Sequence, residues 1–180
     1  SLGGNTPAIG TGLWSQVSGP GTTTFSASGS GSSTATATLY GTYVYQWTIS
    51  NGTCTPSTAQ VTVNFYATPT TATVGSTQNI CGVLLSGSLG GNTPAIGTGL
   101  WSQVSGPGTT TFSASGSGSS TATATVYGTY VYRWTISNGT CTPSTADVTV
   151  NYYATPTTAT VGSTQNICGV LLSGSLGGNT

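Results

Sequence analysis

Residues 128–152 read GTYVYRWTISNGTCTPSTADVTVNY, and this stretch decides the fold class. Before its Asn138-Gly139 dipeptide, large apolar side chains occupy every second position, namely Tyr130, Tyr132, Trp134 and Ile136. After it the same period returns at Ala146, Val148, Val150 and Tyr152. A period of two is typical of strands with one buried face, and Asn-Gly is typical of tight hairpin turns. The pattern therefore predicts an antiparallel hairpin with an aromatic inner face.

Charged side chains are almost missing from the chain. Its 180 residues include one basic residue, Arg133, one acidic residue, Asp147, and no His. General acid–base catalysis needs groups that titrate near neutral pH, nucleic-acid binding needs several basic residues, and calcium sites need clustered carboxylates. We therefore expect no enzyme activity, no nucleic-acid partner, no metal site and no cofactor.

The remaining composition favours an all-β fold. Strong helix formers are rare, whereas 28 Gly and 8 Pro divide the chain into short segments rich in Thr, Val and Tyr. No run of about 18 apolar residues is present, so we expect no membrane insertion. Besides the hairpin, the local patterns predict strands at 72–80, 83–89, 99–104 and 121–126.

The sequence is a tandem repeat with a period of 87 residues. Residues 88–174 repeat residues 1–87 with four differences, and residues 175–180 repeat residues 1–6. This length suits one β-sandwich domain per repeat. Pro- and Thr-rich stretches after Tyr66 and Tyr153 mark the expected boundaries. The predicted organisation is residues 1–66 as a sandwich lacking its first strand, 67–153 as a complete sandwich, and 154–180 as the opening strands of another, within a longer periodic chain.

The four differences between the copies test the hairpin. They are Leu39 to Val126, Gln46 to Arg133, Gln60 to Asp147, and Phe65 to Tyr152. A charge pair thus replaces a pair of amides at two positions that the alternation places on the outer face of adjacent strands. We expect Arg133 and Asp147 to form a cross-strand ion pair. The hydroxyl of Tyr152 is expected to reach solvent at a domain end.

Four cysteines allow two disulfide patterns. Cys54, Cys81, Cys141 and Cys168 contain no C-x-x-C spacing, which argues against a metal site. Pairs Cys54–Cys81 and Cys141–Cys168 would link successive domains across the linker. A Cys81–Cys141 bond would instead close one domain, with Cys54 and Cys168 paired to neighbouring repeats outside the chain. The linker-based boundaries favour the second pattern.

The repeat resembles a known class of surface domain. A QNIC segment (78–81), a G-x-W strand (99–101) and the G-T-Y-x-Y-x-W segment (128–134) are similar to the PKD-like and Ig-like repeats of large Bacteroidetes surface proteins. These include gliding-motility adhesins and other cargo of the type IX secretion system. The resemblance implies a tandem β-sandwich, an extracellular location at the bacterial cell surface and no catalysis. The Cys81–Cys141 pairing also matches that group.

Two functions remain after these exclusions. The first is structural: a segment of a long filament or adhesin stalk, in which disulfide-stapled beads contact further copies of the repeat in line and, in a bundle, laterally. The second is multivalent contact with glycans or another surface through exposed aromatic rings, in which repetition raises avidity. Exposure of Trp101 together with Tyr127 would favour the second function. Burial of Trp101 in the core with Tyr130, Tyr132 and Trp134 would favour the first.

Overall fold

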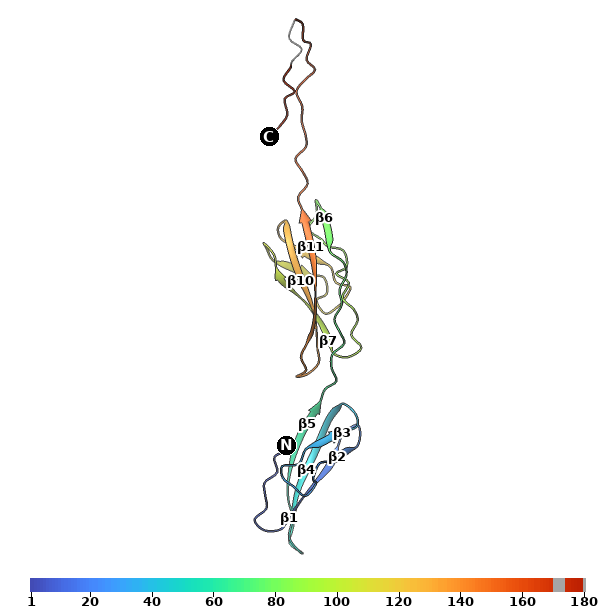
Figure 1. The fold of residues 1–180 in the computed structure, drawn as a ribbon, viewed down its shortest axis with the longest axis vertical. Helices are drawn as coiled ribbons and strands as arrows, with labels where there is room; N and C mark the ends of the chain where they lie inside the picture. The colour runs from blue at the N-terminus through green and yellow to red at the C-terminus, as the bar shows by residue number, and fades with distance from the viewer. Residues whose placement is uncertain (170–173, 180) are drawn as a thin grey trace.

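The computed structural model describes residues 1–169 and 174–179 and shows an elongated all-β protein. Two β units lie in line, and the C-terminal segment (residues 154–180) continues away from the second unit (Figure 1). We name residues 1–66 the first unit and residues 67–153 the second unit. No helix of the described part is long and apolar enough to cross a membrane.

The second unit contains a four-stranded sheet and a short ribbon. The sheet has the order β6-β11-β10-β7, in which only the β6–β11 pairing is parallel. Its strands are β6 (Gln78–Cys81), β7 (Thr98–Ser105), β10 (Gly128–Ser137) and β11 (Ser144–Tyr153). The ribbon pairs β8 (Thr110–Phe112) with β9 (Ala122–Ala124). Its two layers enclose one core, as a β-sandwich does.

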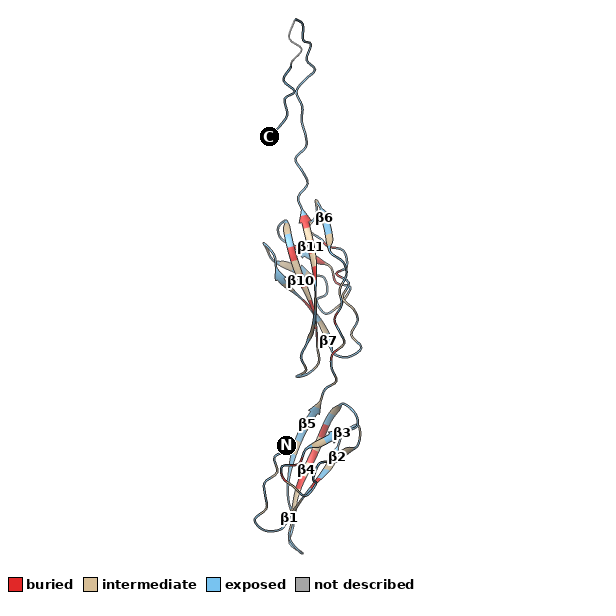
Figure 2. Ribbon diagram, viewed as in Figure 1, coloured by how far each residue is buried: buried red, intermediate tan, exposed pale blue. Residues whose placement is uncertain are grey.

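The inner face of β10 supplies the largest side chains of this core. All four residues predicted from the alternation are fully buried: Tyr130, Tyr132, Trp134 and Ile136. Trp134 lies opposite Trp101 of β7, and their ring centroids are 5.1 Å apart. Figure 2 shows these buried positions in red along the centre of the sheet. The period of two thus describes β10 along its whole length.

The first unit repeats this arrangement with one strand fewer. Its sheet has the order β1-β4-β5, and β2 pairs with β3. The strands are β1 (Thr11–Ser18), β2 (Thr23–Phe25), β3 (Ala35–Ala37), β4 (Gly41–Ser50) and β5 (Ser57–Phe65). No described strand corresponds to β6, so the outer edge of β5 is unpaired.

Three strand predictions need correction. Of the predicted strand 72–80, only the end pairs in a sheet, as part of β6. Residues 83–89 form a single bridge, from Leu85 to Thr123, in place of a strand. The short strand β8 was not predicted. Residues 67–89 run along the sandwich and use side chains as well as backbone as hydrogen-bond partners, which a periodicity of hydrophobic residues does not detect.

Candidate functional site

The β10–β11 hairpin brings the only two charged side chains together. Arg133 is directly opposite Asp147 in the strand register. The guanidinium donates two hydrogen bonds, from Nε to Oδ1 at 2.7 Å and from Nη2 to Oδ2 at 2.8 Å. In the first unit, Gln60 Nε2 donates to Gln46 Oε1 at 2.9 Å in the same place. The substituted pair therefore keeps a cross-strand contact that the amides already make.

The ion pair and the buried tyrosines show the clearest electrostatic effects. The hydrogen bonds from Arg133 lower the pKa of Asp147 below its ordinary value of 3.8, and Asp147 raises the pKa of Arg133. Burial raises the pKa of Tyr132, although the hydrogen bond with Thr110 acts in the opposite direction. Burial also raises the pKa of Tyr152. None of these groups is poised to exchange protons near neutral pH.

Tyr152 lies in the core instead of at the surface. It is 1% exposed, and its hydroxyl donates to the carbonyl oxygen of Ala122 at 3.0 Å. The expectation that this hydroxyl reaches solvent is therefore wrong, because residues 67–89 cover the end of the sandwich above it. Trp101 is 2% exposed, whereas Tyr127 is 42% exposed. The two rings do not form a joint exposed surface for stacking on sugars.

The predicted Cys81–Cys141 disulfide does not form in this fold. All four cysteines are free, and Cys81 pairs with Tyr153 at the last position of β11. Cys141 precedes Ser144, the first residue of the same strand. A strand of this length spans about 30 Å, whereas disulfide-bonded Cα atoms lie within about 7 Å. The two cysteines therefore occupy opposite ends of the second unit.

A junction of five residues fixes the second unit on the first. Asn138 Nδ2 donates to the carbonyl oxygen of Ala67 at 2.8 Å. Cys141 Sγ lies 3.4 Å from that oxygen and 3.7 Å from the carbonyl oxygen of Tyr66. The ring of Tyr66 packs on Gly139 so closely that a Cβ there would overlap it. The hairpin turn of one unit thus grips the exit of the preceding unit.

In the second unit, the core is closed by a covering segment, residues 67–87. Its Ala72 is buried, and Val74, Ile80 and Leu84 pack against the core. Its backbone is also held: the N–H of Ala72 donates to Ser144 Oγ at 2.9 Å, the N–H of Ala124 to the Leu84 oxygen at 2.9 Å, and Gly82 to the Tyr153 oxygen at 2.8 Å. The sandwich is complete only with this segment in place.

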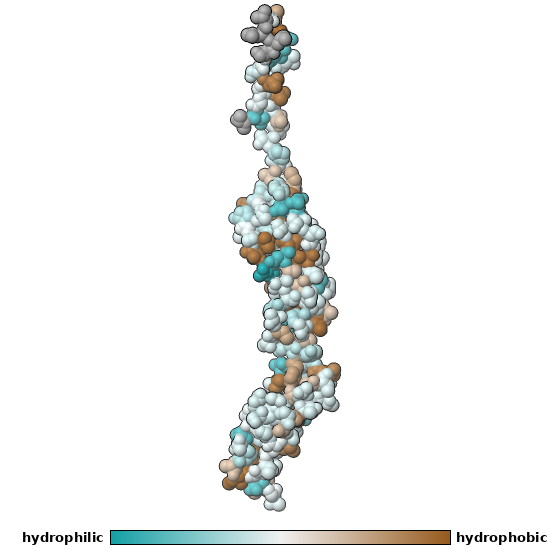
Figure 3. Space-filling model, in the orientation of Figure 1, coloured by the Kyte–Doolittle hydropathy of each residue, from teal (hydrophilic) through white to brown (hydrophobic). Residues whose placement is uncertain are grey.

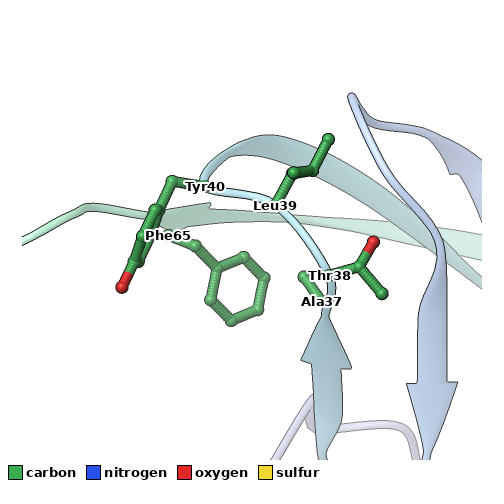
Figure 4. Close-up of a pocket in the computed structure, with 5 residues that line it drawn as sticks. All are labelled: Ala37, Thr38, Leu39, Tyr40 and Phe65. Carbon is green, nitrogen blue, oxygen red and sulfur yellow. The ribbon is translucent and has the colours of Figure 1, made fainter.

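The first unit has an open groove where the covering segment would lie. One end of the groove is a cavity of about 220 Å³ lined by Ala37, Thr38, Leu39, Tyr40 and Phe65. Figure 4 shows the Phe65 and Tyr40 rings and Leu39 around this opening. The counterpart of Ala37 is Ala124, which is buried beside Leu84 in the second unit.

The other end of the groove exposes the tryptophan pair of the first unit. A cavity of about 290 Å³ is lined by Leu2, Trp14, Trp47, Ala59 and Val61, among others. Trp47 Nε1 is buried without a hydrogen-bond partner, whereas its counterpart Trp134 donates to the Asn92 oxygen at 3.2 Å. Asn92 is itself held by the covering segment, through Thr71 and Thr73. The unpartnered indole N–H therefore reports the missing segment.

No protein-family model matches the chain, and no curated protein matches it. Among solved structures, the PKD domain of the KIAA 1837 protein is 23% identical, with a TM-score of 0.41, over 48% of this chain and 91% of that one. Domains 4 and 5 of the S-layer protein SbsC are 18% identical, with a TM-score of 0.35, over 79% and 70%. The insect immune protein hemolin is 14% identical, with a TM-score of 0.33, over 82% and 40%. These similarities concern the fold alone.

Within the described residues, no three His, Cys, Asp or Glu side chains group as metal ligands would. The features that remain are the junction, the open groove and the free cysteines. All three are surfaces for contact between polypeptide segments.

Proposed function

We propose that this protein is a structural repeat segment of a long extracellular filament or stalk at a bacterial cell surface. Each 87-residue repeat acts as a rigid bead, and the junction holds successive beads in line. The proposed partners are further copies of the same repeat, in line and, in a bundle, laterally. Load is carried along the axis by hydrogen-bonded strands.

The junction is the observation that carries this proposal. A flexible linker would leave Tyr66 and Ala67 in solvent, whereas here Asn138 binds Ala67 and Tyr66 packs on Gly139. Both partner groups recur with the period, because Asn51 and Gly52 are the counterparts of Asn138 and Gly139. A periodic sequence with a fixed junction stacks its domains with a constant rotation and rise, as a helical assembly requires.

The lack of charge supports side-by-side packing. The only two charged side chains neutralise each other, so neighbouring rods carry no net charge to repel each other at any ionic strength. The extracellular, cell-surface location is part of the proposal, supported by the resemblance of the repeat to PKD-like surface domains. Recognition of glycans by Trp101 is not proposed, since that ring lies in the core.

Small-angle X-ray scattering of dilute, reduced protein tests the junction. We expect one narrow distribution of rod-like shapes, and an equal increase in maximum dimension for each 87-residue repeat added to the chain. A broad distribution of angles between the two units would contradict the proposal, because a hinge at residues 66–67 cannot hold beads in line.

A further inference from the structure

We propose that the groove of the first unit binds a donor segment, residues 154–174, from a second copy of this chain. Copies would then join head to tail into an open-ended polymer. This deepens the in-line structural role proposed above and rests on it. The donor segment crosses from one copy to the next by adding its strand to the free edge of β5, a known mode of peptide recognition.

The sequence of the donor segment matches the groove by internal repetition. Residues 154–174 are identical to residues 67–87, which close the core of the second unit. The residues that receive the covering segment have counterparts in the first unit: Ser144 corresponds to Ser57, Asn92 to Asn5, and Ala124 to Ala37. The contacts made by residues 67–87 in the second unit are therefore the contacts expected in the groove.

The donor segment carries apolar side chains that its own copy leaves in solvent. Val161 is 84% exposed and Ile167 is 54% exposed. Their counterparts Val74 and Ile80 pack against the core of the second unit. Figure 3 shows brown apolar side chains along the narrow C-terminal segment, which contacts neither sandwich. Burying these side chains in the groove would favour association through the hydrophobic effect.

Geometry requires the donor to come from another copy. The covering segment starts at the hairpin-turn end of its unit, where Asn138 binds Ala67. A donor segment would therefore begin beside Asn51, at the hairpin-turn end of the first unit. In its own copy, however, Ala154 follows Tyr153 at the far end of the second unit. Two units separate these places, about 60 Å from the rise of their ten-residue strands, and no residues are free to bridge them.

The last residues of the chain do not obstruct this exchange. Residues 175–180 repeat residues 1–6, which already lie in the first unit, where Leu2 N–H donates to Ser33 and Gly4 N–H to Gly31. Gly162 makes the same backbone contact with Leu176 that Gly75 makes with Leu89. Either copy of the hexapeptide can therefore pair with the donor, because the two offer identical groups.

The polymer would bring all four cysteines into pairs. Cys168 of the donor copy would lie opposite Tyr66 of the acceptor, as Cys81 lies opposite Tyr153, and acceptor Cys141 Sγ is 3.7 Å from the Tyr66 oxygen. The same stacking places donor Cys81 beside acceptor Cys54. In each pair two thiols would lose two protons and two electrons, forming one S–S bond. A disulfide oxidoreductase would accept the electrons, its own disulfide becoming a dithiol.

The mass distribution of the reduced protein tests the polymer. We expect sedimentation and light scattering to show chains whose mean mass rises with concentration, and electron microscopy to show rods with a two-unit period. Controlled oxidation should convert them into a ladder on non-reducing gels, with Cys54–Cys81 and Cys141–Cys168 peptides. Mixing chains of two isotopic compositions should give both pairs as mixed-isotope species. A monomer or a closed dimer at high concentration would overturn the proposal.

Substitutions in the donor segment separate assembly from folding. In Ile167→Asp, a charge replaces a side chain that the free copy exposes, so both units should stay folded while the polymer is lost. Thr164→Asp adds the same charge at a position whose counterpart, Thr77, is exposed in the second unit, and it should still polymerise. A variant ending at Gly174 should also polymerise, whereas one ending at Tyr153 should stay monomeric. Equal behaviour of the two Asp variants would contradict a role for the segment.

A synthetic peptide of residues 154–174 tests the groove directly. We expect one peptide to bind each Ile167→Asp chain, to shift the indole N–H resonance of Trp47 and to leave that of Trp134 in place. Absence of binding would overturn the donor-segment proposal. It would leave the in-line role intact if scattering still shows rigid two-unit rods. Flexible units with normal peptide binding would give the reverse result.

Discussion

Cys141 Sγ lies 3.7 Å from the carbonyl oxygen of Tyr66, a residue 75 positions earlier in the chain. This contact joins the hairpin turn of one unit to the exit strand of another. It also places the cysteine beside the position where a preceding repeat would carry the counterpart of Cys81. The junction therefore combines the mechanical contact between units with a site for covalent closure.

Replacing Gly139 by Ala should loosen the junction. Gly139 has a φ of +56°, and a methyl group there would overlap the Tyr66 ring. Gly52→Ala is a matched control, because Gly52 has the same φ but no neighbour within 4 Å. Both variants should show similar strain within their hairpins. Only Gly139→Ala should broaden the range of angles between units in small-angle scattering. Identical scattering from the two variants would contradict a rigid junction.

The Arg133–Asp147 pair should make a small, pH-dependent contribution to stability. The pKa of Asp147 is lowered in the folded state, so the contribution is present above its ordinary value of 3.8 and is lost as pH falls through the lowered value. Urea unfolding of the protein and of Asp147→Asn between pH 7 and pH 2 should converge at the acid end. The double variant Arg133→Gln/Asp147→Gln should recover part of the loss, because Gln46 and Gln60 bond in the same register. A constant difference at all pH values would exclude the ion pair as its source.

Alkaline pH should unfold the second unit through its buried tyrosines. Burial raises the pKa of Tyr132 above its ordinary value of 10.0, so its neutral form stabilises the fold below pH 10. This stability is lost as pH rises toward the raised value. Absorbance of tyrosinate and circular dichroism should change together for this residue. Tyr132→Phe should move the alkaline transition to higher pH, whereas ionisation before unfolding would contradict the assignment.

The indole N–H groups should distinguish the two units. Trp134→Phe removes the hydrogen bond to Asn92, which we expect to cost about 1 kcal/mol beyond the loss of ring volume. Trp47→Phe removes an N–H that has no partner, so it should lack that part of the cost. Urea unfolding of each variant, followed by the remaining tryptophans, measures the difference. If both substitutions cost the same in the monomer, the groove is already closed.

The hairpin could be predicted from sequence because its determinants are local. The alternation from Tyr130 to Ile136 assigns the buried face, and the turn at Asn138-Gly139 sets the register. That register places Arg133 opposite Asp147. The strand at 72–80 was predicted too long, because its residues bind side chains and loops from distant parts of the chain. The division at residues 66 and 153 stays a prediction, with which the two separate cores agree.

The sequence by itself determined the all-β fold, the repeat and the face of each hairpin, since strand periodicity acts between neighbouring residues. Only the tertiary structure decided where the cysteines lie. The parallel pairing of β6 with β11 carries Cys81 to the end of the unit opposite Cys141. It also showed that residues 67–87 close the core of the second unit and that the first unit lacks their equivalent. These relations join segments about 70 residues apart, and no local pattern encodes them.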